Sequence, residues 1–431
     1  MPIWNPEAET RSREDIVQVQ LERLQSAVFR CYKDVAFYKK KFDELKISPE
    51  DVQSLGDLRK LPFTSKSDLR DSYPYGMFAV PLREIVRIHS SSGMTGLPAV
   101  VGYTRNDLKN WGDLCARILF AAGVTRDDVV QIAFDYGIFT GAFGFHQGAE
   151  HVGASVIPTS VGHTDRQVKI IQDFKTSALA CTPTYALVIA GKMEEMGVDP
   201  QSTSLKIGIF GAEPWSEATR AEIEQRLKIK AADNYGITEV IGPGVAGECE
   251  ARCGLHIQED HFIAEVIDPE SLEVLPAGSE GELVITTLTK EGFPLIRYRT
   301  GDITTIDTKP CSCGRTFARM ARVFHRTDDM IIVGGVNIFP SMIENILKQF
   351  VRELPEYQIV VERKAAKDEV RINVEVTETL FLDEMRALRE LHQKMEKALQ
   401  AGIGVSLKLK LVEPNSIRTG DGPVKRVIDN R

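Results

Sequence analysis

The pattern of hydrophobic and polar positions divides the chain into three parts. Between residues 10 and 45, apolar residues recur at helical spacing with charged residues between them, which predicts a helix. Further along, strands are predicted for the short apolar runs 129–134, 178–181 and 206–210. Helices are predicted for 165–175, 183–196 and 216–227. This alternation is typical of α/β layers built on largely parallel sheets.

The pattern changes after about residue 262. Strands at 263–267, 282–287 and 303–306 are separated by Gly and Pro turns rather than by long helices, which indicates an antiparallel or barrel-like subregion.

A third pattern begins after about residue 328. Its predicted elements are a helix at 340–350, strands at 357–363 and 370–376, a helix at 381–400 and a strand at 404–411. The predicted fold is therefore α/β, with a large N-terminal domain (1–327) that includes a barrel-like β subregion. A small, mobile α+β domain (328–431) follows it and has an ordinary domain size.

The composition excludes several classes of protein. The 431 residues are 43% hydrophobic and 26% charged, unlike a disordered chain, a collagen or a disulfide-rich miniprotein. The net charge of −8 does not indicate a protein that binds nucleic acid. No apolar run approaches the ~18 residues that a membrane helix needs. Seven cysteines and a polar N-terminus without a secretory pattern indicate reduced thiols and a cytoplasmic protein.

Hydroxyl groups and glycines crowd the segment from Ser90 to Gly96, directly after a strand-like stretch. In such a loop, backbone N–H groups can converge on an anion and the hydroxyls add further donors. It is not a Walker loop, because the Gly-Lys-Ser/Thr ending is missing. A flexible polar turn is the alternative interpretation.

Two later segments add side chains that suit the other parts of a nucleotide. Tyr235, Thr238 and Glu239 lie within five residues and suit a ring, a phosphate and a metal ion. Asp302 follows a glycine turn and could accept two hydrogen bonds from a ribose diol. An ordinary loop and a surface turn are the alternative interpretations.

Taken in order, these three segments resemble the adenylate-forming superfamily of acyl-CoA synthetases, and within it the phenylacetate-CoA ligases. Further segments carry that resemblance over nearly the whole chain: Leu61–Thr64, Tyr136–Gly141, Gly211–Trp215, Gly242–Val245, Glu259–Phe262, Thr286–Glu291, Asn337–Pro340 and Arg426–Asp429.

The resemblance implies that ATP activates an aryl acid, phenylacetate, to an acyl-adenylate with release of pyrophosphate, after which the thiol of CoA displaces AMP. The residues that it implies around ATP are Ser91, Ser92, Gly93, Thr95, Ala212, Glu213, Pro214, Asp233, Asn234, Tyr235, Gly236, Thr238, Asp302 and Arg326. Of these, the loop from Ser91 to Thr95 holds the pyrophosphate end.

The resemblance also implies individual roles within this set. Thr238 bonds the α-phosphate, Glu239 binds Mg²⁺, and Asp302 holds the ribose hydroxyls. Tyr235 stacks on the adenine, while Arg326 contacts the ribose or phosphate. One glutamate is chemically sufficient, because Mg²⁺ keeps several waters and few protein carboxylates.

The acyl pocket and the hinge follow from positions next to these motifs. Tyr136, Phe139, Gly141 and Ile237 are expected to line the pocket, and an apolar aromatic lining favours an aryl acid. The alternative is that Tyr136 and Phe139 are ordinary core residues. Asp328 matches the pivot at which the C-terminal domain rotates, where one loop residue absorbs the backbone change.

The chain departs from the family at two places. Met94 stands where the phosphate loop usually has a hydroxyl residue, and Leu97 stands near a frequent lysine. Near the C-terminus, Pro423 fills the position of the family's reactive lysine, and Lys425 lies two residues further on. Positions two apart share a face in an extended segment, so Lys425 is expected to supply the ammonium group for adenylation.

Cysteine and histidine spacing predicts a structural zinc site. Zinc requires four Cys or His ligands in a tetrahedron. Cys311 and Cys313 would supply one half, and His256 with one cysteine the other. Cys249 is preferred for that position, with Cys253 as the alternative, and free thiols are the interpretation without a metal.

The sequence therefore favours an ATP-dependent aryl-acid–CoA ligase that uses Mg²⁺, carries zinc, and acts as a cytoplasmic homodimer on small molecules, without nucleic acid or membrane. One alternative is an adenylyltransferase resembling coenzyme F390 synthetase, which the Pro423 departure allows. The other is a non-catalytic nucleotide- or acyl-CoA-binding module, which the presence of Thr238, Glu239 and Asp302 disfavours.

Overall fold

The structure is a computed structural model. It describes residues 3–91, 97–213, 215–327, 331–334, 336–350, 355–364, 367–375, 385–413, 416–417 and 426–431. These residues form two compact units, one ending at Thr327 and the other beginning, among the described residues, at Ile331.

A nine-stranded mixed sheet forms the centre of the larger unit, in the order β13-β14-β9-β8-β7-β6-β5-β3-β4. Its parallel strands are β3 (Val129–Ile132), β4 (Ser155–Ile157), β5 (Ala178–Cys181), β6 (Ile207–Gly211) and β7 (Lys230–Ile237). Its antiparallel strands are β8 (Gly242–Glu248), β9 (Leu255–Ile257), β13 (Ile306–Asp307) and β14 (Arg319–Met320). The sequence predicted β3, β5 and β6 of the parallel half but not β4, and it did not show that the chain turns back directly after β7.

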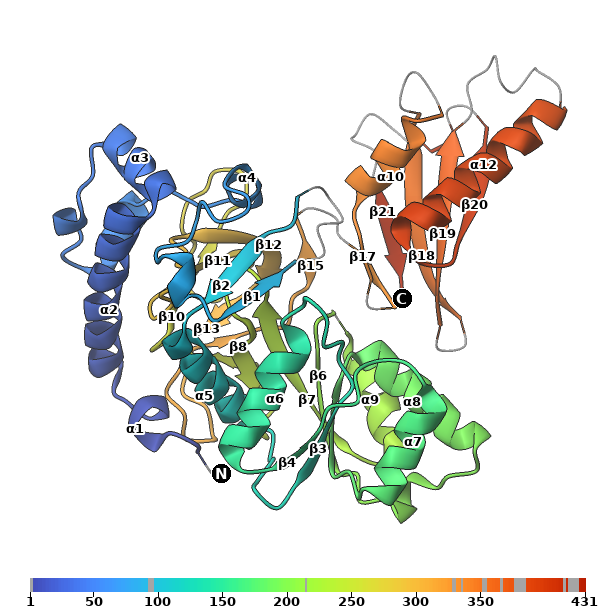
Figure 1. Ribbon diagram of the computed structural model, residues 1–431, viewed down its shortest axis with the longest axis horizontal. Helices are drawn as coiled ribbons and strands as arrows, with labels where there is room; N and C mark the ends of the chain where they lie inside the picture. The colour runs from blue at the N-terminus through green and yellow to red at the C-terminus, as the bar shows by residue number, and fades with distance from the viewer. Residues whose placement is uncertain are drawn as a thin grey trace. The chain divides into compact units, whose positions relative to one another are not determined.

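Helices pack on both faces of this sheet (Figure 1). One group consists of α5 (Arg105–Ala121) and α6 (Gly141–Val152). The other consists of α7 (Thr164–Asp173), α8 (Pro183–Glu195) and α9 (Glu217–Leu227). Buried apolar side chains from α5 and α6, such as Leu119 and Phe145, pack with Val130 and Ile132 of β3, which gives the α/β layering predicted from the alternating pattern.

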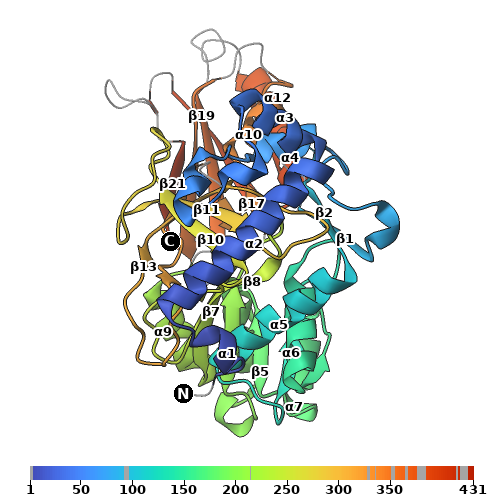
Figure 2. The ribbon, with the colours of Figure 1, turned by 90° about the vertical axis from the view of Figure 1, so that its left-hand side faces the viewer.

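The helix predicted over residues 10–45 is in fact two helices, α2 (Arg13–Asp34) and α3 (Ala36–Leu45). The break lies at Val35, whose backbone is extended (φ −117°, ψ 108°) and whose side chain is buried. Figure 2 shows α2 crossing the larger unit, where the Gln20 amide donates to the carbonyl oxygens of Glu259 and Phe262 at 2.9 and 3.2 Å.

Short elements complete the N-terminal region. They are α1 (Pro6–Glu9), α4 (Lys66–Asp71) and the 3₁₀ turns Pro49–Asp51, Leu55–Lys60 and Leu82–Glu84. A further 3₁₀ turn, Pro200–Ser202, lies between α8 and β6. Strands β1 (Arg87–Ser90) and β2 (Val100–Tyr103) pair antiparallel and flank the predicted phosphate loop.

The region after residue 262 is antiparallel, as its pattern predicted. The sheet contains β10 (Phe262–Ile267), β11 (Gly281–Thr287), β12 (Tyr298–Thr304) and β15 (His325–Arg326), in that order.

The smaller unit has the predicted α+β organisation. Its four-stranded sheet contains β18 (Tyr357–Lys364), β19 (Lys367–Glu375), β20 (Leu407–Val412) and β21 (Val427–Asn430) in the order β20-β19-β18-β21. Its other elements are the hairpin β16 (Ile331–Val333) and β17 (Val336–Ile338) and the helices α10 (Pro340–Leu347) and α12 (Met385–Ile403). Its core includes Ile343, Ile359, Ile372 and Leu399. Of the helices in the described residues, none is long and apolar enough to cross a membrane.

A buried ion pair joins α9 to β7 and β8. The two terminal nitrogens of Arg220 bond the Ala231 carbonyl at 2.8 Å and the Glu248 carboxylate at 2.9 and 2.8 Å. Glu248 also accepts the backbone N–H of Asp233 at 3.0 Å. The side chains of Arg220 and Glu248 are only 3% and 5% exposed. Each buried charge is therefore stable only because the opposite charge lies beside it.

We expect Arg220→Met to lower the free energy of unfolding of the larger unit by about 3–5 kcal/mol, because it leaves the Glu248 carboxylate buried without its cation. The double variant Arg220→Met/Glu248→Leu should recover much of that loss. Urea unfolding of both variants checks this, with Arg226→Met, which breaks a more exposed pair, as the control. Equal stability of the single and double variants would contradict the assignment.

Candidate functional site

Several of the sequence-predicted residues follow parallel strands at their carboxyl edge, where open α/β sheets bind ligands. Three loops begin there: 133–140 after β3, 212–216 after β6 and 238–241 after β7. The hydroxyl oxygens of Thr140 and Thr238 lie 3.2 Å apart, so the first and third loops meet. Thr238 and Glu239 occupy the turn between β7 and β8, and Glu239 is 4% exposed.

The loop after β6 has an unusual backbone. Ala212 has a φ of +66°, which an L side chain rarely adopts. A Cβ at Gly211 would lie 2.6 Å from the side-chain amide nitrogen of Asn234. Glycine at this position therefore permits β6 and β7 to lie close to each other. The Asn234 amide donates to the Phe210 carbonyl at 2.7 Å, and the Glu213 carboxylate accepts the Thr184 N–H at 2.6 Å.

Trp215 anchors that loop between two guanidinium groups. The side chains of Arg220 and Arg322 lie 5.0 and 4.7 Å from the centre of its ring. Arg322 also pairs with the Asp233 carboxylate at 3.0 Å. Burial raises the pKa of Asp233. Sequence reasoning missed both arginines: Arg322 is distant in the chain, and Arg220 belongs to no motif even though it lies only five residues after Trp215.

Asp302 is the most strongly held carboxylate of the site. The Tyr235 hydroxyl donates to one of its oxygens at 2.6 Å, and the Arg326 guanidinium bonds the other. Arg326 also donates to the Thr300 carbonyl at 2.9 Å. Burial raises the pKa of Tyr235, and the Asp302 carboxylate beside it raises it further, so the phenol keeps its proton and acts as a donor.

The four expected acyl-pocket residues lie on neighbouring elements. Tyr136 and Phe139 belong to the loop after β3, Gly141 begins α6, and Ile237 ends β7. The sequence did not reveal the partners of Tyr136. Its hydroxyl lies 2.9 Å from Nδ1 of His146, and its ring packs edge-on against Phe143 at 5.2 Å. Phe139 is 39% exposed.

Only the base of the predicted phosphate loop is described. The Ser91 N–H donates to the Ala99 carbonyl and the Ala99 N–H donates to the Ser91 hydroxyl, both at 3.0 Å. Six expected functional residues lie outside the described residues: Ser92, Gly93, Thr95, Pro214, Asp328 and Lys425.

The structure brings together Cys249, His256, Cys311 and Cys313, whose ligand atoms all lie within 4.8 Å of one another. The sulfurs of Cys249 and Cys311 are 3.8 Å apart, and the Cys313 sulfur is 3.4 Å from Nε2 of His256. Zinc–sulfur bonds of ~2.3 Å in a tetrahedron place two sulfurs roughly 3.8 Å apart, so the donor set fits zinc. Three of these residues follow β8 or precede β14, and His256 lies in β9.

Cys253 also approaches this cluster, but from its exposed side. Its sulfur is 3.4 Å from that of Cys311 and accepts a hydrogen bond from Arg319 at 2.6 Å. Because Arg319 already bonds the Cys253 sulfur, Cys249 is favoured as the fourth ligand of a metal ion.

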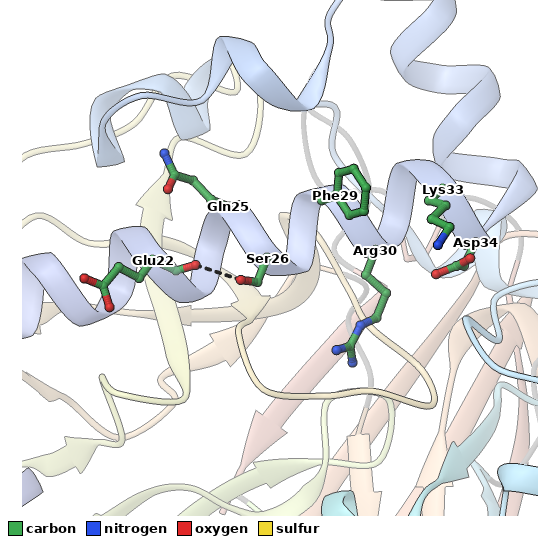
Figure 3. Close-up of a pocket in the computed structure, with 7 residues that line it drawn as sticks. All are labelled: Glu22, Gln25, Ser26, Phe29, Arg30, Lys33 and Asp34. Carbon is green, nitrogen blue, oxygen red and sulfur yellow. Dashed lines mark hydrogen bonds between the residues drawn. The ribbon is translucent and has the colours of Figure 1, made fainter.

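A separate surface hollow lies along α2 (Figure 3). Its lining consists of one helix, with Glu22, Gln25, Ser26, Phe29, Arg30, Lys33 and Asp34. None of the motif residues lines it, so it is not part of the candidate site.

Comparison with known proteins places these residues in a family. Residues 18–289 match the model of the AMP-binding enzyme, and residues 335–431 match that of the AMP-binding enzyme C-terminal domain. Phenylacetate-coenzyme A ligase of Thermus thermophilus is 45% identical, with all of both chains covered. That of Escherichia coli is 44% identical, with 98% of this chain and 97% of the other covered.

A solved structure agrees. 2-Hydroxyisobutyryl-CoA ligase, in complex with 2-HIB-AMP and CoA in the thioesterification state, is 31% identical with a TM-score of 0.89. The match covers 99% of this chain and 92% of the other.

Proposed function

The chain belongs to the phenylacetate-coenzyme A ligases of the AMP-binding enzyme family, and from that premise we propose how it joins an aryl acid to CoA. Its substrates are ATP, CoA and phenylacetate, and its products are phenylacetyl-CoA, AMP and pyrophosphate. The observation that carries the proposal is the buried Asp302 carboxylate, held by Tyr235 and Arg326 beside loops that match the family's motifs.

In the first half-reaction the substrate carboxylate attacks the α-phosphate of ATP, and negative charge must be stabilised there. Thr238 donates a hydrogen bond from its hydroxyl to the α-phosphate, and its contact with Thr140 ties it to the loop that carries Phe139. Asp302 accepts from the ribose hydroxyls, while Tyr235 and Arg326 fix its orientation. Ser91, with the loop that it opens, holds the pyrophosphate end.

The adenine lies against the loop after β6 and the end of β7. Ala212, Glu213 and Pro214 form one wall, and Asp233, Asn234, Tyr235 and Gly236 form the other. Glu239 is the ligand for Mg²⁺, which supplies charge neutralisation at the phosphates when bound. A single carboxylate in the turn after β7 fits this ion, because Mg²⁺ retains most of its waters.

The aryl group is received by Tyr136, Phe139, Gly141 and Ile237. Residues 1–327 bind ATP and the acid, and residues 328–431 act as a lid that rotates about Asp328. We place Lys425 at the reacting carboxylate in the adenylating arrangement. The next residue, Arg426, bonds Glu356 at 2.6 Å and lies 4.6 Å from the centre of the Tyr357 ring, both within the smaller unit.

The protein is further proposed to act in the cytoplasm as a homodimer. The comparisons do not favour the adenylyltransferase or the non-catalytic module that the sequence alone left open.

We expect phenylacetate to give equal amounts of AMP and phenylacetyl-CoA with ATP, Mg²⁺ and CoA, and we expect benzoate and hexanoate to react more slowly.

Glu239→Gln should reduce turnover about 100-fold while it keeps its affinity for AMP, because only the carboxylate that binds the metal is lost. Glu195→Gln, which changes an exposed glutamate of α8, is the control. An AMP-linked product formed without CoA, or no product with any acid, would contradict the proposed function.

Lys425→Ala should depress acyl-adenylate formation strongly and spare thioester formation from supplied phenylacetyl-adenylate. The reason is that the ammonium group is needed only where the carboxylate attacks the phosphate. Lys410→Ala, on the exposed side of β20, is the matched control. Equal losses in both half-reactions, or no loss in either, would refute the assignment of Lys425 to the first step.

We also propose that Cys249, His256, Cys311 and Cys313 hold one structural zinc ion. The support is the fit of their sulfur and nitrogen spacing to a tetrahedron. The ion would tie the turns after β8 and before β14 to β9.

Elemental analysis of protein purified without added zinc should give about one zinc per chain. Cys311→Ser/Cys313→Ser should lose the metal and unfold at a lower temperature, because structural zinc contributes folding free energy. Cys253→Ser should retain it. An unmetallated parent protein would end this proposal, and loss of zinc from Cys253→Ser would move the fourth ligand to that residue.

A further inference from the structure

We propose that His89 is a positioning residue that couples the nucleotide side of the site to the acyl pocket, so that nucleotide and aryl acid bind cooperatively. The inference rests on the proposed function, since it takes Ser91 as nucleotide-binding and Tyr136 and Phe139 as pocket residues. Neither the motifs nor the comparisons assign a role to His89.

The Ile138 carbonyl receives two hydrogen bonds from β1. The Ser90 N–H donates to it at 3.1 Å, and Nδ1 of His89 lies 3.0 Å from the same oxygen. Because a carbonyl only accepts, Nδ1 carries the proton. Ile138 lies between Tyr136 and Phe139 in the chain. These two hydrogen bonds therefore attach to β1 the stretch of backbone that carries both pocket residues.

The His89 side chain is suited to a fixed, uncharged donor. It is 2% exposed, and burial lowers its pKa, as do the nearby charges of Arg87 and Lys290. Backbone hydrogen bonds with Ile138 and Phe139 raise the pKa of His89, but by less than burial lowers it. The ring is therefore neutral at pH 7, with its proton directed at the Ile138 carbonyl.

Aromatic neighbours hold the ring in that orientation. It meets Tyr103 and Trp111 edge-to-face, with ring centres at 5.5 and 5.7 Å. On another side it contacts Phe143 at 5.3 Å, and Phe143 meets Tyr136 edge-to-face at 5.2 Å. A second path of packed rings thus leads from His89 to the acyl pocket. Because cores are close-packed, the imidazole cannot turn without moving these rings.

In the other direction, β1 leads directly into the phosphate loop. Ser91 is two residues after His89, and its pair of hydrogen bonds with Ala99 closes the base of that loop. His89 itself pairs with Val101 of β2. The proposed link therefore runs from the loop base at Ser91 along a paired strand to the Ile138 carbonyl.

Such a link has a direct use in adenylation. The carboxylate oxygen and the α-phosphorus must be held about 3–3.5 Å apart, and small misplacements cost much of the rate. If nucleotide binding fixes the pocket backbone, the acid binds to a site that already aligns its carboxylate with the α-phosphorus. By linkage, the acid must then tighten nucleotide binding by the same factor.

The test measures phenylacetate affinity calorimetrically with and without Mg²⁺ and α,β-methylene ATP, which cannot be adenylated. In the parent protein we expect each ligand to tighten the other by at least about fivefold. Failure of either ligand to bind alone would contradict the proposed function itself. Binding of both with a coupling factor below twofold would overturn only the role of His89.

Two variants separate the hydrogen bond from the packing. His89→Phe keeps an aromatic ring but removes the donor, and we expect its coupling factor to fall below twofold while its affinity for nucleotide alone changes by less than twofold. His89→Asn loses the ring but places an amide nitrogen as many bonds from Cα as Nδ1, and it should retain most of the coupling. Retention of coupling in His89→Phe would overturn the proposal.

Hydrogen exchange on the parent protein keeps the proposal testable if His89→Phe does not fold, which its unfolding temperature will show. α,β-Methylene ATP alone should slow exchange in the segment 133–140, because that backbone is tied to β1. Unchanged exchange there, with nucleotide bound, would overturn the link.

Discussion

The carboxylate of Asp302 joins the two sheets from which the site is built. It lies on β12 of the antiparallel sheet and accepts the Tyr235 hydroxyl from β7 of the nine-stranded sheet, while Arg326 of β15 holds its other oxygen. A buried carboxylate is stable only with such partners, so the sheets are fixed relative to each other at this point. The same group is the one that we propose for the ribose. The contacts that join the two sheets therefore also orient the carboxylate that we propose for the ribose.

The second constraint is the common edge of the parallel strands. Because β3, β6 and β7 run in one direction, their following loops open at the same edge, and the Thr140–Thr238 contact brings two of them together. The residues that we propose for the aryl pocket and for the phosphates are thus carried by loops that meet. Through the Ile138 carbonyl, His89 connects one of these loops to β1. The cysteine and histidine cluster lies among β8, β9 and β14, in the antiparallel half of that sheet.

The sequence predicted those parts of the molecule that local patterns encode. The periodicity located β3, β5, β6 and the helices α7, α8 and α9, but not α5 or α6, and motif resemblance selected Tyr235, Asp302 and Arg326. It did not reveal that these three side chains bond one another, since the contact depends on two sheets meeting. The break at Val35 was missed because apolar spacing continues through it. Likewise, Arg322 and Trp215 become neighbours only after folding, and no spacing in the chain reports that.

The central claim is that this site adenylates the aryl acid before CoA takes part. The most direct test is isotope exchange between pyrophosphate and ATP, measured with Mg²⁺ and without CoA. We expect exchange that depends on phenylacetate and is lost in Asp302→Ala, where the carboxylate that joins Tyr235 and Arg326 is removed. Exchange that requires CoA, or that proceeds equally without the acid, would contradict it.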